Sequence, residues 1–460
     1  MLEKDSLKIL LEALNKLDEG FTGLPDFDSH PPQAEKMAEV LSATAGRLQD
    51  NYPYFHPLYA GQMLKSPHPV ARSAYALAQW INPNNHALDG GRASSAMEKE
   101  AVAEIAQMFG WREHLGHLTS GGTMANLEAL WVAGQLAPGT MIVASEQSHY
   151  THQRISGVLK LAFEAIPCDA RGRMDVRALR KRLTRGDIGT VVVTMGTTAT
   201  GSVDPLVEIL ELQREFRFRV HADAAYGGYF GLADNLESET REAFEQLARV
   251  DSIVLDPHKH GLQPYGCGCV LFRDPDVGPL YKHDSPYTYF SSKELHLGEI
   301  SLECSRAGAA AVALWATQRL LPLIKAGEFA KGLQQCREAA KEFHRRLAAD
   351  SRFVTAFAPQ LDIVIFVPRS DSVSASSALS RRFFDAAAAK NLHLAVAQLP
   401  IAFFEANLRG MKKEKDKEKE TITCLRSVLM KPEHQEWLPR IWDILEKVTA
   451  ETLGSPASST

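Results

Sequence analysis

The chain lacks long apolar runs and has few cysteines for its 460 residues. Nowhere do about 18 uninterrupted apolar residues occur, so no membrane-spanning helix is predicted. The six cysteines are scattered and do not form a disulfide framework. Excess positive charge is also absent, and the formal net charge of −5 argues against a nucleic-acid or anionic-membrane surface. The charged start contains no apolar signal segment, and we expect a cytoplasmic location.

The spacing of metal ligands is missing as well. Cys267 and Cys269 alternate within a strand-like run, but no second cysteine pair accompanies them. His149 and His152 can share one helical face, but no glutamate completes an H-E-x-x-H motif. We therefore expect structural packing for these side chains and no metal site.

Apolar strand-like runs alternate with helical stretches over the middle of the chain. The runs are residues 141–144, 165–168, 190–194, 219–222 and 253–255. Such alternation predicts an α/β protein with a mostly parallel sheet that is covered by helices on both faces.

Helix-start signals lie between and before these runs. Asp175 and Asp204 are predicted helix caps, and Pro205 takes the favoured first position of the second helix. Ser95 and Glu98 have the spacing of a capping box, which predicts the start of a further helix at residue 95.

The predicted pattern of helices and strands changes twice along the chain. Residues 1–60 are predicted helices broken by proline-rich joints, and their leucines recur at a helical spacing that requires a surface to cover. Residues 61–310 contain the strand–helix alternation. Beyond them, alanine-rich helices and the apolar runs 363–367 and 424–430 predict a smaller α/β domain over residues 311–460. We therefore expect an N-terminal helical segment, a large domain and a small C-terminal domain.

Four polar residues follow the predicted strands at their carboxyl ends, namely His149, Thr198, Asp223 and Lys259. In a parallel sheet these ends meet at one edge, where ligands bind. A lysine can form an imine with an aldehyde, and an aspartate can pair with a protonated ring nitrogen. These are the two protein groups that pyridoxal 5'-phosphate (PLP) chemistry needs most, so the sequence predicts a PLP site at this edge.

A phosphate site is predicted where residues 117–123 precede a helical stretch that runs to about Leu136. Small residues at a helix start let backbone N–H groups approach a phosphate, and the helix dipole favours the anion. Ser120 or Thr123 adds a hydroxyl, and residues 196–198 offer further hydroxyls at the same sheet edge.

Together these residues resemble the PLP-dependent group II amino-acid decarboxylases, which have the type I (aspartate aminotransferase-like) fold. The likeness covers roughly residues 50–430 and is strongest to the aromatic-L-amino-acid, tyrosine and glutamate decarboxylases. It rests on motifs at residues 56–57 (HP), 119–126 (TSGGTMAN), 148–150 (SHY), 196–204, 221–226 (HADAAY) and 256–259 (DPHK). The resemblance implies a mostly parallel central sheet and a smaller C-terminal α/β domain.

The resemblance also implies roles around the cofactor ring. Lys259 would hold PLP as an imine, and Asp223 would pair with the pyridinium nitrogen. His149 would stack on one face of the ring, and Ala225 would pack against the other.

For the phosphate and its surroundings, the resemblance implies four further residues. Gly122, Thr123 and His258 would bind the phosphate. Thr198 would lie near the ring hydroxyl and the region that binds the substrate carboxylate. His260, where many relatives carry a hydrophobic residue, predicts a more polar site.

The proton that replaces CO₂ needs an acid on a loop. Residues 281–292 contain three tyrosines and a proline without periodicity, which is typical of a loop. In the family a tyrosine after the lysine is the usual donor, and Tyr287 is the best match, with Tyr289 as its rival. Either could instead line the substrate pocket. Arg306 would reach a phosphate or carboxylate, or would pin the following helix.

Three functions stay open at this point. The first is PLP-dependent decarboxylation of an L-amino acid, with aromatic substrates slightly favoured by Tyr54, Phe55, Tyr59 and the tyrosine-rich loop. The second is an aminotransferase or carbon–carbon lyase of the same fold, in which Arg426 would bind a substrate carboxylate. The third is a non-catalytic binding protein, against which the intact lysine and aspartate argue. The fold implies a homodimer with its sites at the subunit interface.

Overall fold

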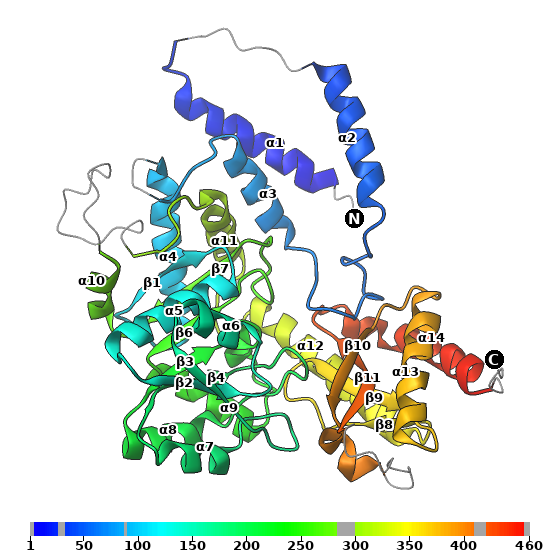
Figure 1. Cartoon of the computed structure of the whole chain (residues 1–460). Helices are drawn as coiled ribbons and strands as arrows, with labels where there is room; N and C mark the ends of the chain where they lie inside the picture. Colours follow the sequence, from blue (N-terminus) through cyan, green and yellow to red (C-terminus); the bar gives the residue numbers. More distant parts are fainter. Residues whose placement is uncertain (1–3, 26–32, 87–89, 283–299, 409–419, 455–460) are drawn as a thin grey trace.

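The computed structural model describes residues 4–25, 33–86, 90–282, 300–408 and 420–454. Two sheets organise it, each with its own helices, as Figure 1 shows. No helix within these ranges is long and apolar enough to cross a membrane.

The larger sheet has seven strands in the order β1-β7-β6-β5-β4-β2-β3. Four adjacent pairs are parallel, whereas β7 runs antiparallel to both β1 and β6. The predicted α/β class with a mostly parallel sheet is therefore confirmed. In chain order the strands are β1 (Leu115–Thr119), β2 (Met141–Ser145), β3 (Ala162–Ile166), β4 (Ile188–Thr194), β5 (Arg219–Asp223), β6 (Ser252–Leu255) and β7 (Gly268–Phe272).

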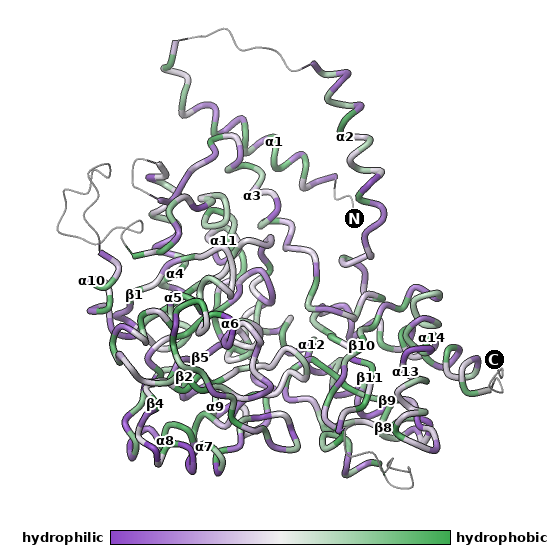
Figure 2. The backbone as a smooth tube through the Cα atoms, in the orientation of Figure 1, coloured by the Kyte–Doolittle hydropathy of each residue, from purple (hydrophilic) through white to green (hydrophobic). Residues whose placement is uncertain are grey.

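Helices cover this sheet, and every residue of β4, β6 and β7 is buried, as a doubly covered sheet requires. Figure 2 shows the hydrophobic segments concentrated there. The helices of this part are α3 (Pro69–Gln79), α4 (Arg92–Met108), α5 (Gly122–Leu136), α6 (Thr151–Val158), α7 (Val176–Leu183), α8 (Leu206–Phe216), α9 (Ser238–Glu245), α10 (Gly278–Tyr281) and α11 (Gly308–Leu320).

One of the two predicted aspartate caps is confirmed. Asp175 accepts hydrogen bonds from two backbone N–H groups at the start of α7. The cap predicted at Asp204 is wrong, because its carboxylate is buried and accepts instead from Met174 N at 2.7 Å and Thr194 N at 2.8 Å. Asp204 thus ties two distant segments together rather than starting α8.

The predicted capping box is also wrong. Helix α4 begins three residues earlier, with Gly91 as its cap, so Ser95 lies inside the helix. Both Ser95 and Glu98 are buried. The Glu98 carboxylate accepts a hydrogen bond from Asn85 at 2.6 Å and binds Arg306 at 2.6 Å.

The smaller sheet has four antiparallel strands in the order β10-β11-β9-β8. The predicted runs 363–367 and 424–430 correspond to β9 and β11, whereas β8 and β10 were not predicted. The strands are β8 (Phe353–Thr355), β9 (Ile363–Pro368), β10 (Ala395–Pro400) and β11 (Thr421–Val428), and the helices are α12 (Glu328–Ala349), α13 (Val373–Ala388) and α14 (His434–Gly454).

Two N-terminal helices precede the larger sheet, α1 (Lys4–Asp18), which lies against α3, and α2 (Ala34–Leu48), which stands apart in Figure 1. Neither helix has a buried residue, and the apolar side chains of Leu7, Leu11 and Leu41 are 59–61% exposed. The expected leucine-striped helix is present; Leu10, Leu14 and Leu17 are half-buried, whereas Leu7 and Leu11 stay exposed in a single chain. The division of the chain at residues 60 and 310 stays a prediction.

Candidate cofactor site

A cavity of about 300 Å³ lies at the carboxyl ends of β4, β5 and β6, beside the start of α5. Ligands bind at this edge of parallel sheets. The structure brings eight of the nine predicted site residues to its walls: Gly122, Thr123, His149, Thr198, Asp223, Ala225, His258 and Lys259. The ninth, Tyr287, lies outside the described residues, as does its rival Tyr289.

The start of α5 forms one wall of the cavity, where its backbone lies very close to Asp256 and to the start of β7. A Cβ added at Gly122 would lie 2.7 Å from Asp256 Oδ2, and one added at Gly268 would lie 2.6 Å from Gly121 Cα. Only glycine fits at both positions. The first N–H groups of a helix have no partner within the helix, so this turn offers donors and a favourable dipole to an anion.

Lys259 and its neighbours form the opposite wall. Lys259 Nζ lies 2.9 Å from Asp256 Oδ2, an ion pair that the sequence interpretation missed. Three other buried polar atoms at this cavity, Asp256 Oδ1, His258 Nδ1 and Thr194 Oγ1, have no hydrogen-bond partner among the described residues. Unpartnered buried polar atoms are rare, and around one cavity they indicate a polar ligand.

Asp223 is held through both of its oxygens. Oδ1 accepts from Ala225 N at 3.2 Å, and Oδ2 lies 2.8 Å from Nε2 of the buried His152. Burial alone would raise the pKa of Asp223, but the hydrogen bond and charge of His152, followed by the charge of Lys259, hold that pKa well below its usual range. Asp223 is therefore a carboxylate.

His149 lines the cavity as a neutral ring, because burial lowers its pKa. Its Nδ1 accepts from Thr151 N at 3.3 Å, which fixes the plane of the ring. His152, three residues later, reaches Asp223 instead of the cavity. The two histidines that were considered as metal ligands therefore have different surroundings, His149 at the cavity and His152 at Asp223. No group of three or more side chains that could hold a metal ion occurs in the described ranges.

A second buried histidine, His221, supports the start of α5 through Asn126. His221 Nε2 lies 2.8 Å from Asn126 Oδ1, and Asn126 Nδ2 donates to Gly122 O at 2.8 Å. Burial lowers the pKa of His221 to about 3, so the ring is neutral. Its position was part of a quoted motif, but its contact with α5 joins residues 95 positions apart and could not be read from spacing.

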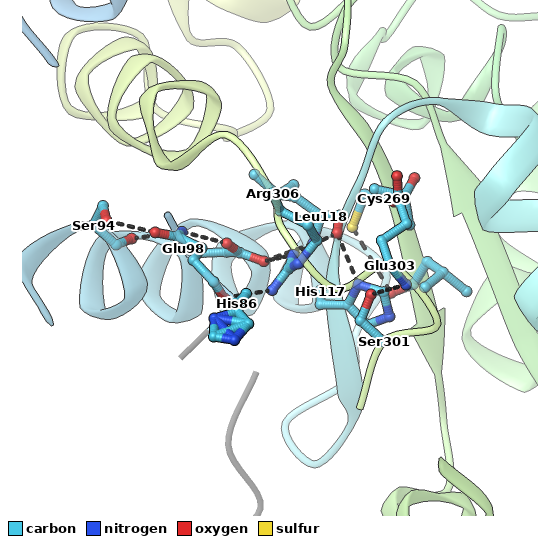
Figure 3. A network of polar contacts seen from close by, with 12 residues as sticks. His86, Ser94, Glu98, His117, Leu118, Cys269, Ser301, Glu303 and Arg306 are labelled. Carbon is cyan, nitrogen blue, oxygen red and sulfur yellow. Dashed lines mark hydrogen bonds and ion pairs between the residues drawn. The ribbon is translucent and has the colours of Figure 1, made fainter. Parts of the chain in front are cut away.

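Arg306 does not line the cavity. Its Nη1 donates to Glu98 Oε1 at 2.6 Å and to Leu118 O at 2.7 Å, as Figure 3 shows. Of the two alternatives for Arg306, the structure therefore supports pinning of neighbouring segments. Nearby, Glu303 Oε2 accepts from Ser120 N at 2.9 Å, at the edge of the phosphate turn.

Two further polar residues also lie away from the cavity lining. His260 is buried between the rings of Tyr226 and Phe230, 3.2 Å from Asp362 Oδ2, so the expectation that it makes the site more polar is wrong. Arg426, in β11, is buried and donates from Nη1 to Gly61 O at 3.3 Å and to the side chain of Gln62 at 3.1 Å.

Comparison with known proteins decides the family. A model of the pyridoxal-dependent decarboxylase conserved domain matches residues 31–369. The chain belongs to the pyridoxal-dependent decarboxylase family. The decarboxylase resemblance read from the sequence motifs is therefore confirmed.

Individual decarboxylases show how this chain relates to the family. It is 26% identical to an L-tyrosine decarboxylase of Enterococcus faecium, over 86% of this chain and 85% of that protein. It is 36% identical to an L-2,4-diaminobutyrate decarboxylase of Rhizobium meliloti, over 57% of this chain and 55% of that protein.

Solved structures show that the type I fold is also confirmed. Catharanthus roseus tryptophan decarboxylase in complex with L-tryptophan matches with a TM-score of 0.73 at 18% identity, over 94% of this chain and 91% of that one. Rhodiola rosea 4-hydroxyphenylacetaldehyde synthase matches with a TM-score of 0.75 at 18% identity, over 98% of each chain.

PLP is the cofactor of this decarboxylase, and the residues present fit it. The cavity volume is within the range that small ligands occupy. The start of α5 suits the phosphate, Lys259 is placed for the aldehyde carbon, and the Asp223 carboxylate suits a protonated ring nitrogen. Family membership makes the chain a PLP-dependent carboxy-lyase of amino-acid metabolism.

Proposed function

We propose that this chain decarboxylates an aromatic L-amino acid, such as tyrosine or tryptophan, to its amine and CO₂. The observation that carries the proposal is the convergence of Lys259, Asp223 and the start of α5 on one cavity. The aromatic preference is supported by the L-tyrosine decarboxylase of Enterococcus faecium, which the chain matches over most of both lengths.

Asp223 and His149 control the electronics and the orientation of the cofactor. When bound, PLP withdraws electrons from Cα of the substrate as CO₂ leaves. Asp223 supplies the buried negative charge that keeps the ring nitrogen protonated. His149, fixed by Thr151, holds the ring plane, and orientation of the ring decides which bond at Cα is broken.

The remaining site residues anchor the cofactor and the substrate. The N–H groups at Gly122 and Thr123, together with the hydroxyl of Thr123 and the His258 ring, would hold the phosphate. Lys259 would attach the cofactor through its amine. Thr198 would lie close to the ring hydroxyl and the substrate carboxylate.

A covalent label tests this assignment directly. Borohydride reduction of the yellow holoprotein, followed by peptide mapping, should place the phosphopyridoxyl group on Lys259. Lys65 and Lys431 are the matched controls, because burial lowers the pKa of both amines as well. A label on either of them, or no PLP uptake at all, would contradict the proposed site.

The substrate and the reaction are tested together by a panel of L-amino acids. CO₂ release and keto-acid formation should be scored in parallel, and we expect CO₂ and amine from tyrosine or tryptophan. Arg426 keeps an aminotransferase as the alternative, because its Nη2 and Nε have no hydrogen-bond partner among the described residues. Keto acid without CO₂ would favour that alternative.

We also propose that the chain forms a homodimer in the cytoplasm. Helices α1 and α2 expose apolar side chains and bury none, so a second copy is the surface that they would cover. Sedimentation should give a dimer, and Leu7→Lys with Leu11→Lys should weaken it. An active monomer at assay concentration would contradict the proposal.

Tyr287 is our proposed proton donor to Cα, on a segment outside the described residues. Tyr287→Phe should still bind PLP and release CO₂, but less of the product should be amine, because the proton reaches the cofactor carbon instead and a carbonyl product forms. Tyr289→Phe is the control. If the control shows this change and Tyr287→Phe does not, the donor is Tyr289.

A further inference from the structure

We infer that His152 is a positioning residue, which keeps Asp223 ionised and aimed at the ring nitrogen of the cofactor from the side opposite the cavity. The inference rests on the proposed function of Asp223. It assigns a task to a side chain that does not itself line the cavity.

The geometry places Asp223 between the cavity and His152. Asp223 lines the cavity, whereas His152 does not. His152 is the second residue of α6, is fully buried, and brings its Nε2 to 2.8 Å from Asp223 Oδ2. Ala225 N engages the other oxygen at 3.2 Å. The carboxylate is thus fixed by one neighbour at each oxygen, and its orientation does not depend on the cofactor.

The direction of the contact follows from its chemistry. A carboxylate only accepts hydrogen bonds, so Nε2 of His152 carries the hydrogen and donates it to Asp223. Its Nδ1 is buried and has no partner among the described residues, so the ring makes no side-chain contact that competes with this one.

Other charged and titratable groups around Asp223 are already engaged. His221, in the same strand, is bound to Asn126 and Ser252. Lys259 pairs with Asp256, and His149 faces the cavity. Within the described part of the chain, His152 alone gives Asp223 a side-chain hydrogen bond.

The contact with His152 would become more important when the cofactor is bound. Against burial, the pKa of Asp223 is lowered first by His152, then by Lys259 and His221. Lys259 would give up its free ammonium on attaching the cofactor, whereas the hydrogen bond from His152 to the buried carboxylate would remain.

A cofactor analogue separates this role from simple space filling. The analogue is PLP with carbon in place of the ring nitrogen, which offers no N–H to Asp223. The ratio of its Kd to that of PLP measures the contact between Asp223 and the nitrogen, without any turnover. The ratio is to be measured from pH 6 to pH 8.5 for the wild type, His152→Phe and His152→Gln. The glutamine variant keeps a side-chain N–H donor.

We expect the wild-type and His152→Gln ratios to run together across this range. In His152→Phe, the effect of burial is offset less, so the pKa of Asp223 rises. Below that new pKa, each pH unit should reduce the preference for PLP about tenfold relative to the wild type, because the carboxylate binds a proton before it can bind the cofactor. His344→Phe in α12, a half-buried histidine far along the chain, controls for the loss of an imidazole.

Each outcome has a separate meaning. A His152→Phe profile equal to that of the wild type overturns the role of His152, and so does a His152→Gln profile as impaired as that of His152→Phe. If His152→Phe does not fold, judged by circular dichroism of the apoprotein, His152→Met replaces it as the variant without a donor. Failure of the wild type to bind PLP would instead contradict the proposed function.

Discussion

Replacing Arg306 by methionine separates its two possible roles. The guanidinium donates from Nη1 to Glu98 Oε1 at 2.6 Å and to Leu118 O at 2.7 Å, and from Nη2 to Asn85 O at 3.2 Å. Methionine keeps much of the apolar stem but none of these donors. Arg306→Met would leave a buried carboxylate without its counter-charge, and the carbonyl groups of Asn85 and Leu118 would each lose a hydrogen bond.

The size of the effect follows from burial. The Arg306 and Glu98 side chains are 6% and 2% exposed, so water screens the pair little. Removing one member of a buried ion pair costs about 3–5 kcal/mol. Because the loss comes mainly from the stranded carboxylate, adding Glu98→Gln should recover about 1–3 kcal/mol of it as a coupling energy.

Urea unfolding of the apoprotein, followed by circular dichroism, measures the free energy of unfolding of each variant. Arg345→Met is the matched control, because Arg345 is exposed and its partner Glu342 is a neighbour in the same helix. Its unfolding curve should match that of the wild type. If Arg306→Met unfolds like the wild type but binds PLP more weakly, Arg306 serves the phosphate and our reading of the network in Figure 3 is wrong.

Three further perturbations have defined outcomes. Asp223→Asn should keep the fold but slow amine formation at saturating PLP by about 10²-fold or more, equivalent to several kcal/mol of barrier; wild-type turnover would contradict this. Gly122→Ala should raise the Kd of PLP about tenfold or more, since its Cβ would lie 2.7 Å from Asp256 Oδ2 and displace the phosphate turn. Burial lowers the pKa of Lys431 from 10.5 to about 7, so between these values the unfolded chain binds the extra proton and stability rises with pH. Lys431→Met should flatten that rise in urea unfolding measured from pH 7 to pH 10.

The site could be predicted from the sequence because its residues follow strands of a parallel sheet. Short, mostly apolar runs precede His149, Asp223 and Lys259, and the carboxyl ends of neighbouring parallel strands meet at one edge of a sheet. The anion site at the start of α5 could also be predicted, because small residues before a helix form a local sequence pattern. The positions of these residues relative to the predicted strands and helix were therefore enough to predict that they lie around one cavity.

The roles of the buried carboxylates Glu98 and Asp204 were predicted incorrectly, because their partners are remote in the sequence. Ser95 and Glu98 have the spacing of a capping box, but Arg306, 208 residues away, takes the Glu98 carboxylate. Asp204 precedes a helix as a cap would, but it is bound by backbone groups of two other segments. Local rules describe a helix end in water, whereas tertiary burial decides where a charged group finds its partners.

His149, just before α6, and His152, inside it, show that one sequence spacing can have two structural outcomes. Residues three apart lie on the same side of a helix, which is why His149 and His152 first suggested metal ligands. The carboxylate of Asp223 arrives from β5 and accepts the hydrogen bond of His152, so that ring is committed before any ion could bind. His149 is left at the cavity wall, held by Thr151. The start of α6 therefore places one ring at the cavity wall and the other against the Asp223 carboxylate.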